Sequence, residues 1–364
     1  MDRRAFAVTA ALALVTWPLG QVAASQAILS STPTAAAVPL PPLPRLSPLD
    51  SARSKKSGVS VAAVTSKKMD KLAPLADAKT ALVAFANSPF PYEGVIPDKA
   101  IPFLDVVDGN RRGHTSGRAG IYWEDETYRD RSVLLSFPQR FDLRKPAVIV
   151  LFFHGNEATL ARDVVARQQV VDQLAASGLN AVLVAPQFAY DAKDSSAGNF
   201  WRPGFFARFL KEAATRLAKL YGPGATPAAF DRLPVVLVAY SGGYNAAGYV
   251  LAVGGATRRV RGLMLFDALY GEEDKFVDWI ARYRKSAFFF SAYSQSSAAG
   301  NAEAEGQIRA RHIAVRESPP TRLQPGTVTF LATDPAIPHD DFVTSAWVPL
   351  PLQWLLERVP GFPR

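Results

Sequence analysis

The stretch that most constrains the fold of this chain is residues 234–251, which read PVVLVAYSGGYNAAGYVL. The apolar, β-branched run 235–238 is typical of a strand buried on both faces of a sheet. Small residues dominate the next five positions, with Ser241 at their centre, and an Ala-rich segment that favours a helix follows. The pattern predicts a buried strand, a sharp turn that presents a serine, and a helix packed back against the strand.

A strand, a tight turn and a helix with a serine at the apex form a nucleophile elbow, whose usual sequence is G-x-S-x-G. Bulky side chains two positions either side of the serine would collide where the strand and helix pack. Ala239 replaces the first glycine here and is small enough for that position. An ordinary strand-to-helix turn can also contain Ser-Gly-Gly. The catalytic interpretation therefore requires a base, an acid and an oxyanion site elsewhere in the chain.

Strand-like and helix-like segments alternate after residue 119. We expect strands at 119–123, 132–137, 147–153, 180–185, 234–240, 260–266, 287–292 and 327–331. Helices are expected at 75–86, 158–177, 201–220, 272–284 and 342–358, and a mobile loop at 294–306. This alternation predicts an α/β fold, a doubly wound and mainly parallel sheet flanked by helices. The folded domain is expected at residues 76–364.

The chain begins with features of an export signal. Arg3 and Arg4 precede the apolar run 5–19, and the small-residue stretch 22–27 follows. This arrangement predicts a signal peptide at residues 1–27 that resembles the twin-arginine type of bacteria, and a periplasmic or secreted protein. Cleavage is expected after Ala24 or Ala27, with an uncleaved membrane tether as the alternative. The run is shorter than the ~20 residues of a membrane span, so the mature chain is expected to carry no integral span.

Residues 28–75 are rich in Pro, Ala, Ser and Lys and include the proline-dense run VPLPPLP. Such a segment buries too little apolar surface to offset the entropy of ordering, and it predicts a flexible linker between signal and domain.

Composition narrows the possible partners. The chain has a formal net charge of +9 and no cysteine, which excludes disulfides, cysteine nucleophiles and thiolate metal sites. Its basic residues are interleaved with acids, as in Arg129-Asp130-Arg131, and no aromatic-basic module accompanies them. We therefore expect no nucleic-acid partner. Neither a metal nor a cofactor is expected. The substrate is expected to be a small molecule or derived from the cell envelope, and the oligomeric state stays open.

The base has few candidates, because the chain has four histidines. The order serine, acid, histidine that accompanies a nucleophile elbow leaves His312 and His339. His339 lies in the loop between the last predicted strand and the last predicted helix, at the sheet edge where Ser241 should emerge. His312 lies in the basic segment 309–312, which is typical of a solvated surface. We favour His339 as the base. The alternative is that His339 is a loop residue that only caps the terminal helix.

The acid has two candidates. The strand after the elbow ends in Asp267, and a carboxylate buried at a strand end requires a partner such as the His339 imidazole. Asp334, five residues before His339, is the alternative. Asp267 could also be structural and cap the next helix. The second strand after the elbow, 287–292, offers serines but no nearby carboxylate.

The oxyanion site is expected to use the backbone N–H of Gly242, which follows the nucleophile, and a donor from the loop after the strand at 147–153. That loop reads His154-Gly155-Asn156. A glycine there lets the backbone approach the substrate oxygen, so Gly155 or Asn156 is expected to supply the second donor. His154 is expected to be architectural.

Taken together, His154-Gly155, the elbow around Ser241, Asp267 and His339 resemble the α/β-hydrolase superfamily of esterases, lipases and related enzymes. The resemblance extends from about residue 119 to the C-terminus and implies a serine hydrolase that acts on an ester through a Ser-His-Asp acyl-enzyme mechanism. It leaves open an amidase or peptidase of the cell envelope with the same triad, and a non-catalytic binding protein of the same fold.

Four aromatic side chains either line a substrate pocket or belong to the hydrophobic core, and the sequence leaves both interpretations open. The residues concerned are Trp201, Tyr240, Tyr244 and Tyr270.

Overall fold

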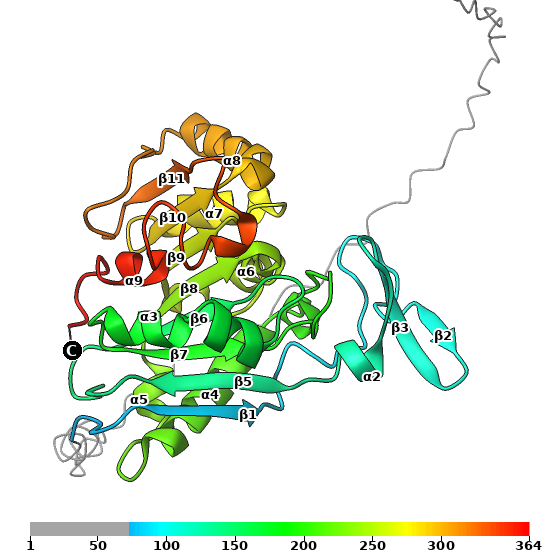
Figure 1. Ribbon diagram of the computed structural model, residues 1–364, viewed down its shortest axis with the longest axis horizontal. Helices are drawn as coiled ribbons and strands as arrows, with labels where there is room; N and C mark the ends of the chain where they lie inside the picture. Colours follow the sequence, from blue (N-terminus) through cyan, green and yellow to red (C-terminus); the bar gives the residue numbers. More distant parts are fainter. Residues whose placement is uncertain (1–72, 364) are drawn as a thin grey trace, which may run out of the picture. The chain divides into compact units, whose positions relative to one another are not determined.

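The computed structural model describes residues 73–363, and they fold around an eight-stranded sheet (Figure 1). The predicted signal at 1–27 and almost all of the predicted linker at 28–75 lie outside the described residues. In spatial order the strands are β1 (Lys79–Ala84), β5 (Ser132–Phe137), β7 (Ala181–Pro186), β6 (Val148–Phe153), β8 (Val235–Tyr240), β9 (Val260–Phe266), β10 (Phe288–Tyr293) and β11 (Val328–Ala332). The pairs β1–β5 and β5–β7 are antiparallel, and all other pairs are parallel.

Helices cover both faces of this sheet (Figure 1). One face packs against α4 (Phe205–Tyr221), α5 (Pro227–Asp231), α6 (Tyr244–Ala252), α7 (Glu273–Tyr283) and α8 (Ala298–Ala310). The other packs against the π-helix η1 (Leu160–Arg167), α3 (Val170–Ala176) and α9 (Pro351–Leu356). Successive side chains of β8 enter opposite cores, because side chains alternate along a strand. The predicted doubly wound, mainly parallel sheet of an α/β-hydrolase fold is confirmed.

Four of the predicted segments differ from the structure. Residues 75–86 form no helix; Lys79–Ala84 instead form the edge strand β1, whose side chains alternate between half-buried and exposed. Residues 294–306 are no loop, because α8 begins at Ala298. The helix expected at 158–177 is two helices separated at Gln169, which has a left-handed φ of 52°. The helix expected at 342–358 shortens to α9, which begins at Pro351 because proline favours the first turn of a helix.

A second, three-stranded antiparallel sheet consists of β2 (Val106–Asp108), β3 (Arg111–Ser116) and β4 (Gly120–Trp123), with α2 (Glu124–Thr127) after it. The strand predicted at 119–123 therefore exists but belongs to this small sheet. Short 3₁₀ turns complete the secondary structure: η2 (Gly198–Trp201), η3 (Ser241–Gly243), η4 (Thr257–Arg259), η5 (Gln295–Ser297) and η6 (His339–Asp341). Within residues 73–363, each helix is too short or too polar to span a membrane.

The parallel strands β6, β8, β9 and β11 bring four loops to one edge of the large sheet. The segments that follow these strands contain Gly155, Ser241, Asp267 and His339, respectively. The topology thus gathers the predicted site residues from four separate parts of the sequence.

Candidate active site

Ser241 occupies a strained turn between β8 and α6. Its φ is 50°, in the left-handed region that non-glycine residues seldom adopt. A Cβ at Gly243 would lie 2.6 Å from the Phe153 carbonyl oxygen and 3.0 Å from that of His154. Glycine at 243 therefore lets the start of α6 approach the end of β6. Ala239, in place of the first glycine of the usual motif, is fully buried.

The structure brings Ser241, His339 and Asp267 together in one hydrogen-bonded series. His339 Nε2 lies 2.8 Å from Ser241 Oγ, and His339 Nδ1 lies 2.7 Å from Asp267 Oδ2. An ionised Asp267 can only accept, so Nδ1–H donates to it and Nε2 accepts from the serine hydroxyl. The imidazole stacks on Tyr240 with ring centroids 5.2 Å apart, and Tyr240 Oη donates to the His339 carbonyl at 3.0 Å. Packing and hydrogen bonds thus both hold the ring in place.

Asp267 is fully buried and has a φ of 43°. Besides His339, it accepts hydrogen bonds from the Ser294 N–H at 2.9 Å, from the Ser294 and Ser296 hydroxyls at 2.8 Å, and from the Ser297 hydroxyl. Burial by itself raises the pKa of this carboxyl, but the hydrogen bonds from His339 and the three serines outweigh it. The pKa of Asp267 therefore lies below its ordinary value, and the group is a carboxylate at neutral pH.

The alternative candidates lie elsewhere. Asp334 accepts a hydrogen bond from the Ala336 N–H at 2.9 Å, which is a turn contact within its own loop. His312 follows α8 as an exposed residue with a φ of 55°. Neither has a hydrogen bond to Ser241 or His339 among the residues the structure describes. The geometry favours Asp267 and His339 over both.

Sequence reasoning missed the residues that support the acid. Ser294, Ser296 and Ser297 follow β10, and all three donate to the carboxylate that follows β9. Tyr270 lies on the same side: its Oη is 2.7 Å from Ser296 Oγ and 3.4 Å from both Asp267 Oδ2 and His339 Nδ1. The sequence did contain one signal for this role: several serines, and no carboxylate, follow the buried strand β10.

The predicted oxyanion residues lie beside Ser241. A Cβ at Gly155 would be 2.7 Å from Ser241 Cβ, and a Cβ at Gly242 would overlap the side-chain amide of Asn156. The loop after β6 and the elbow are therefore in direct contact. Within the described chain, the backbone N–H groups of Gly155 and Asn156 donate no hydrogen bond to the protein.

His154 is buried and takes part in hydrogen bonds that hold its own loop. Its Nδ1 donates to the Gly155 carbonyl at 2.7 Å, and its Nε2 accepts from the Phe188 N–H at 2.9 Å and from Gln187 Nε2 at 3.1 Å. Burial lowers the pKa of His154 to about 4, so the ring stays neutral. It fixes the loop that carries Gly155 and Asn156.

A cavity of about 410 Å³ adjoins this site. Ser195 and Asn245 line it on the side of the elbow, and Trp201 and Tyr249 contribute aromatic surface. Carboxylates are also prominent in its lining: Asp98, Asp105, Asp194 and Glu272. Of the four aromatic residues considered in the sequence, Trp201 thus lines a cavity, while Tyr240 packs under His339. Tyr244 and Tyr270 form a ring pair with centroids 6.0 Å apart.

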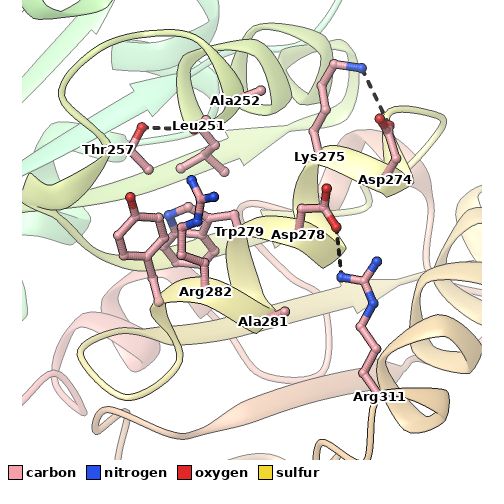
Figure 2. Close-up of a pocket in the computed structure, with 11 residues that line it drawn as sticks. Leu251, Ala252, Thr257, Asp274, Lys275, Asp278, Trp279, Ala281, Arg282 and Arg311 are labelled. Atoms are coloured by element: carbon pink, nitrogen blue, oxygen red, sulfur yellow. Dashed lines mark hydrogen bonds and ion pairs between the residues drawn. The ribbon is translucent and has the colours of Figure 1, made fainter.

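A further hollow of about 690 Å³ lies between the C-terminal end of α6 and α7 (Figure 2). Four of its charged residues pair, Asp278 with Arg311 at 2.8 Å and Asp274 with Lys275 at 3.5 Å. None of the site residues lines it. No group of three or more His, Asp or Glu side chains within residues 73–363 is arranged to hold a metal ion.

The mainly parallel eight-stranded sheet, with helices on both faces, has the arrangement of an α/β-hydrolase fold. No protein-family model matches the sequence, and no curated protein does. Similar solved structures include a feruloyl esterase module from Clostridium thermocellum complexed with sinapinate, at 17% identity and a TM-score of 0.40, over 75% of this chain and 96% of that one. Another is an S-formylglutathione hydrolase from Agrobacterium tumefaciens, at 11% identity and a TM-score of 0.36, over 70% and 97% of the two chains. A Thermogutta terrifontis esterase bound to butyrate is similar at 10% identity and a TM-score of 0.34, over 55% and 77%.

Proposed function

We propose that this chain is a serine hydrolase that cleaves an ester through an acyl-enzyme on Ser241. One observation carries the proposal: Ser241, His339 and Asp267 form an uninterrupted hydrogen-bond series at the carboxyl edge of the sheet. A serine hydroxyl is a weak nucleophile unless an adjacent base takes its proton, and that base acts efficiently only when a third group orients it. The three side chains fill these roles in the order that the chemistry requires.

In the proposed reaction, His339 Nε2 takes the proton of Ser241 as Oγ attacks the substrate carbonyl carbon. The imidazolium is stabilised by Asp267, which accepts from Nδ1–H and stays ionised because its pKa is low. His339 then gives the proton to the leaving alcohol as the carbonyl re-forms and the acyl-enzyme remains. A water molecule, deprotonated by the same imidazole, attacks the acyl-enzyme and releases the acid.

The developing oxyanion is proposed to bind the backbone N–H of Gly242 and an N–H from Gly155 or Asn156. The contact between the β6 loop and the elbow supports this assignment. Each such donor typically contributes ~10²–10³ in rate. The alkoxide of an ester is a better leaving group than the nitrogen of an amide, so the ester is the preferred substrate class of this site.

A fluorophosphonate probe, which phosphonylates an activated serine, tests the proposal directly. Wild-type protein should be labelled stoichiometrically, and Ser241→Ala should not be labelled at all. Ser286→Ala is a matched control, because its hydroxyl contacts the Tyr283 carbonyl near the start of β10, away from the site edge. Absence of labelling in folded wild-type protein refutes the proposal. A panel of para-nitrophenyl esters and anilides of equal acyl length then separates an esterase from an amidase or peptidase.

Export to the periplasm or beyond completes the proposed function, and it is supported by Arg3, Arg4 and the apolar run that follows. Replacing both arginines by lysine should retain the protein in the cytoplasmic fraction of a bacterial host. The mass of the exported wild-type chain shows whether cleavage follows Ala24 or Ala27. An unchanged distribution between the fractions contradicts the twin-arginine assignment.

A further inference from the structure

The small sheet brings the turn between β3 and β4 to the candidate active site. Ser116 Oγ, at the end of β3, donates to the Lys193 carbonyl at 2.7 Å. Tyr122 Oη, on β4, accepts from the Lys193 N–H at 3.0 Å. Both strands of this hairpin are therefore tied to the loop between β7 and α4, which lines the cavity beside the elbow. The turn presents Arg118 at its tip.

The guanidinium of Arg118 lies next to the proposed oxyanion loop. With the Asn156 amide oriented by its hydrogen-bond partners, its nitrogen donates to the Asp194 carbonyl and to Ser195 Oγ, both at 3.0 Å. The Asn156 oxygen then accepts from Arg118 Nη1 at 3.3 Å. The same amide fills the space that a Cβ at Gly242 would occupy. The side chain of Asn156 thus lies between the Arg118 guanidinium and Gly242, the residue that follows Ser241.

The charge of Arg118 also influences the tyrosine pair Tyr244 and Tyr270. Burial raises the pKa of Tyr244 and raises that of Tyr270 to about 12, and the nearby Arg118 guanidinium opposes both shifts. Tyr270 Oη is 3.4 Å from His339 Nδ1. Arg118 thus hydrogen-bonds Asn156 of the proposed oxyanion loop, and its charge reaches Tyr270, whose hydroxyl lies beside His339.

Unlike the other arginines of its hairpin, Arg118 forms no ion pair with a carboxylate of residues 73–363. Arg111 pairs with Asp125 and Glu126, and Arg112 pairs with Glu93 and Glu124. Within residues 73–363 no carboxylate lies within 4.0 Å of the exposed Arg118 guanidinium. A guanidinium presents paired N–H donors that match a carboxylate in a bidentate geometry. A cation of this kind, held by a tied hairpin beside the proposed oxyanion loop, is suited to a negatively charged group on the ligand.

We propose that Arg118 binds a carboxylate of the substrate, so that the enzyme prefers esters that carry a negative charge. The inference rests on the proposed hydrolase function, because it names a substrate class for the same site. The guanidinium is exposed to solvent and its charge is screened by salt. The preference is therefore expected to be on the order of tenfold in kcat/KM and to weaken as the ionic strength rises.

Two matched ester pairs test the proposal. The first pair is the mono-para-nitrophenyl ester of glutarate and para-nitrophenyl pentanoate, which differ by a carboxylate on the acyl side. The second pair is the butyrate ester of para-hydroxybenzoate and that of its methyl ester, which differ on the leaving-group side. The ratio of kcat/KM within each pair is measured for wild type, Arg118→Gln, Arg118→Lys and the control Arg232→Gln. Arg232 precedes β8, at the opposite end of that strand from Ser241.

The expected result is a charged-to-neutral ratio that falls about tenfold in Arg118→Gln for at least one pair, partly recovers in Arg118→Lys, and stays at the wild-type value in Arg232→Gln. The responsive pair identifies the side of the scissile bond that Arg118 faces. Hydrolysis by wild type with the same ratios in Arg118→Gln overturns the role of Arg118 and leaves the hydrolase function standing. Absence of both hydrolysis and fluorophosphonate labelling overturns the hydrolase function and this inference with it.

Discussion

Asp267 is the residue whose surroundings most directly govern the chemistry of the site. Its carboxylate is fully buried, accepts from His339 Nδ1 and is held by donors from three serines. A buried carboxylate is costly unless its lone pairs are satisfied. The serines therefore make it possible for an ionised acid to orient the imidazole from inside the fold.

Replacing Asp267 with asparagine should lower kcat on the order of 10³–10⁴-fold, because an amide can stabilise neither the correct imidazole tautomer nor the imidazolium. Steady-state kinetics on a para-nitrophenyl ester give the comparison. Asp334→Asn is the matched control and should stay within about twofold of wild type, because the Asp334 carboxylate caps only its own turn. A large loss in Asp334→Asn together with an active Asp267→Asn would show that the acid has been misassigned.

The same carboxylate predicts a pH dependence of stability. Its pKa is depressed in the folded protein, so its stabilisation is fully present above the unfolded-state pKa of roughly 3.9 and is lost as the pH falls towards the folded-state pKa. The free energy of unfolding of wild type should therefore decrease more steeply below about pH 4 than that of Asp267→Asn. Urea unfolding at a series of pH values measures this difference, and parallel curves would exclude a depressed pKa.

At this scale the sequence predicted that Ser241, Asp267 and His339 would meet, because strand ends mark where side chains emerge from the sheet. Ser241 follows a buried run with small residues around it, and His339 follows the last strand. It did not predict the serines that hold Asp267, because their role depends on β9 and β10 being neighbours in the sheet. Arg118 was missed for a related reason: its hairpin belongs to a small sheet whose position depends on contacts with Lys193.

Among the structural elements, the elbow depends on close packing of α6 against β6. Gly243→Ala should destabilise the protein by about 1–3 kcal/mol and lower its activity, because the new Cβ would lie 2.6 Å from the Phe153 carbonyl oxygen. Gly306→Ala is the matched control on α8, where a Cβ meets nothing within 4 Å; it should stabilise the protein by roughly 0.5–1 kcal/mol. Denaturant unfolding measures both. A Gly243→Ala protein as stable as wild type would mean that the elbow tolerates a side chain there.

The elements that the sequence misjudged share a physical cause. Residues 75–86 contain several helix formers, yet Lys79–Ala84 pair with β5 because alternate side chains face the core, a tertiary effect that outweighs local propensity. Residues 294–306 are small and polar, yet those from Ala298 onward belong to α8 (Ala298–Ala310), whose Ala304 and Ile308 bury against the sheet. Strands buried on both faces were predicted well, because their continuous apolar runs carry the signal locally.

For the whole molecule, the contacts at the start of the described chain define where the folded unit needs to begin. The Ala73 carbonyl accepts from Tyr221 Oη at 2.8 Å, and Leu75 exchanges backbone hydrogen bonds with Phe141 and Arg140. Strand β1 pairs with β5 along all six of its residues. Segments from the N-terminal end of the described chain thus complete an edge of the large sheet.

A chain that begins at Ala73 should therefore keep the melting temperature of the full chain and its fluorophosphonate labelling, whereas a chain that begins at Ala86 should lose both. The shorter chain lacks β1 and Phe85, which is buried against Phe209 with ring centroids 5.4 Å apart. Burial of that one phenylalanine contributes about 1.5–3 kcal/mol, a large part of a typical stability of roughly 5–15 kcal/mol. Removal of β1 also exposes the edge of β5, which favours association between chains. Circular dichroism and size-exclusion chromatography distinguish the outcomes, and a monomeric, labelled chain from Ala86 would show that β1 is dispensable.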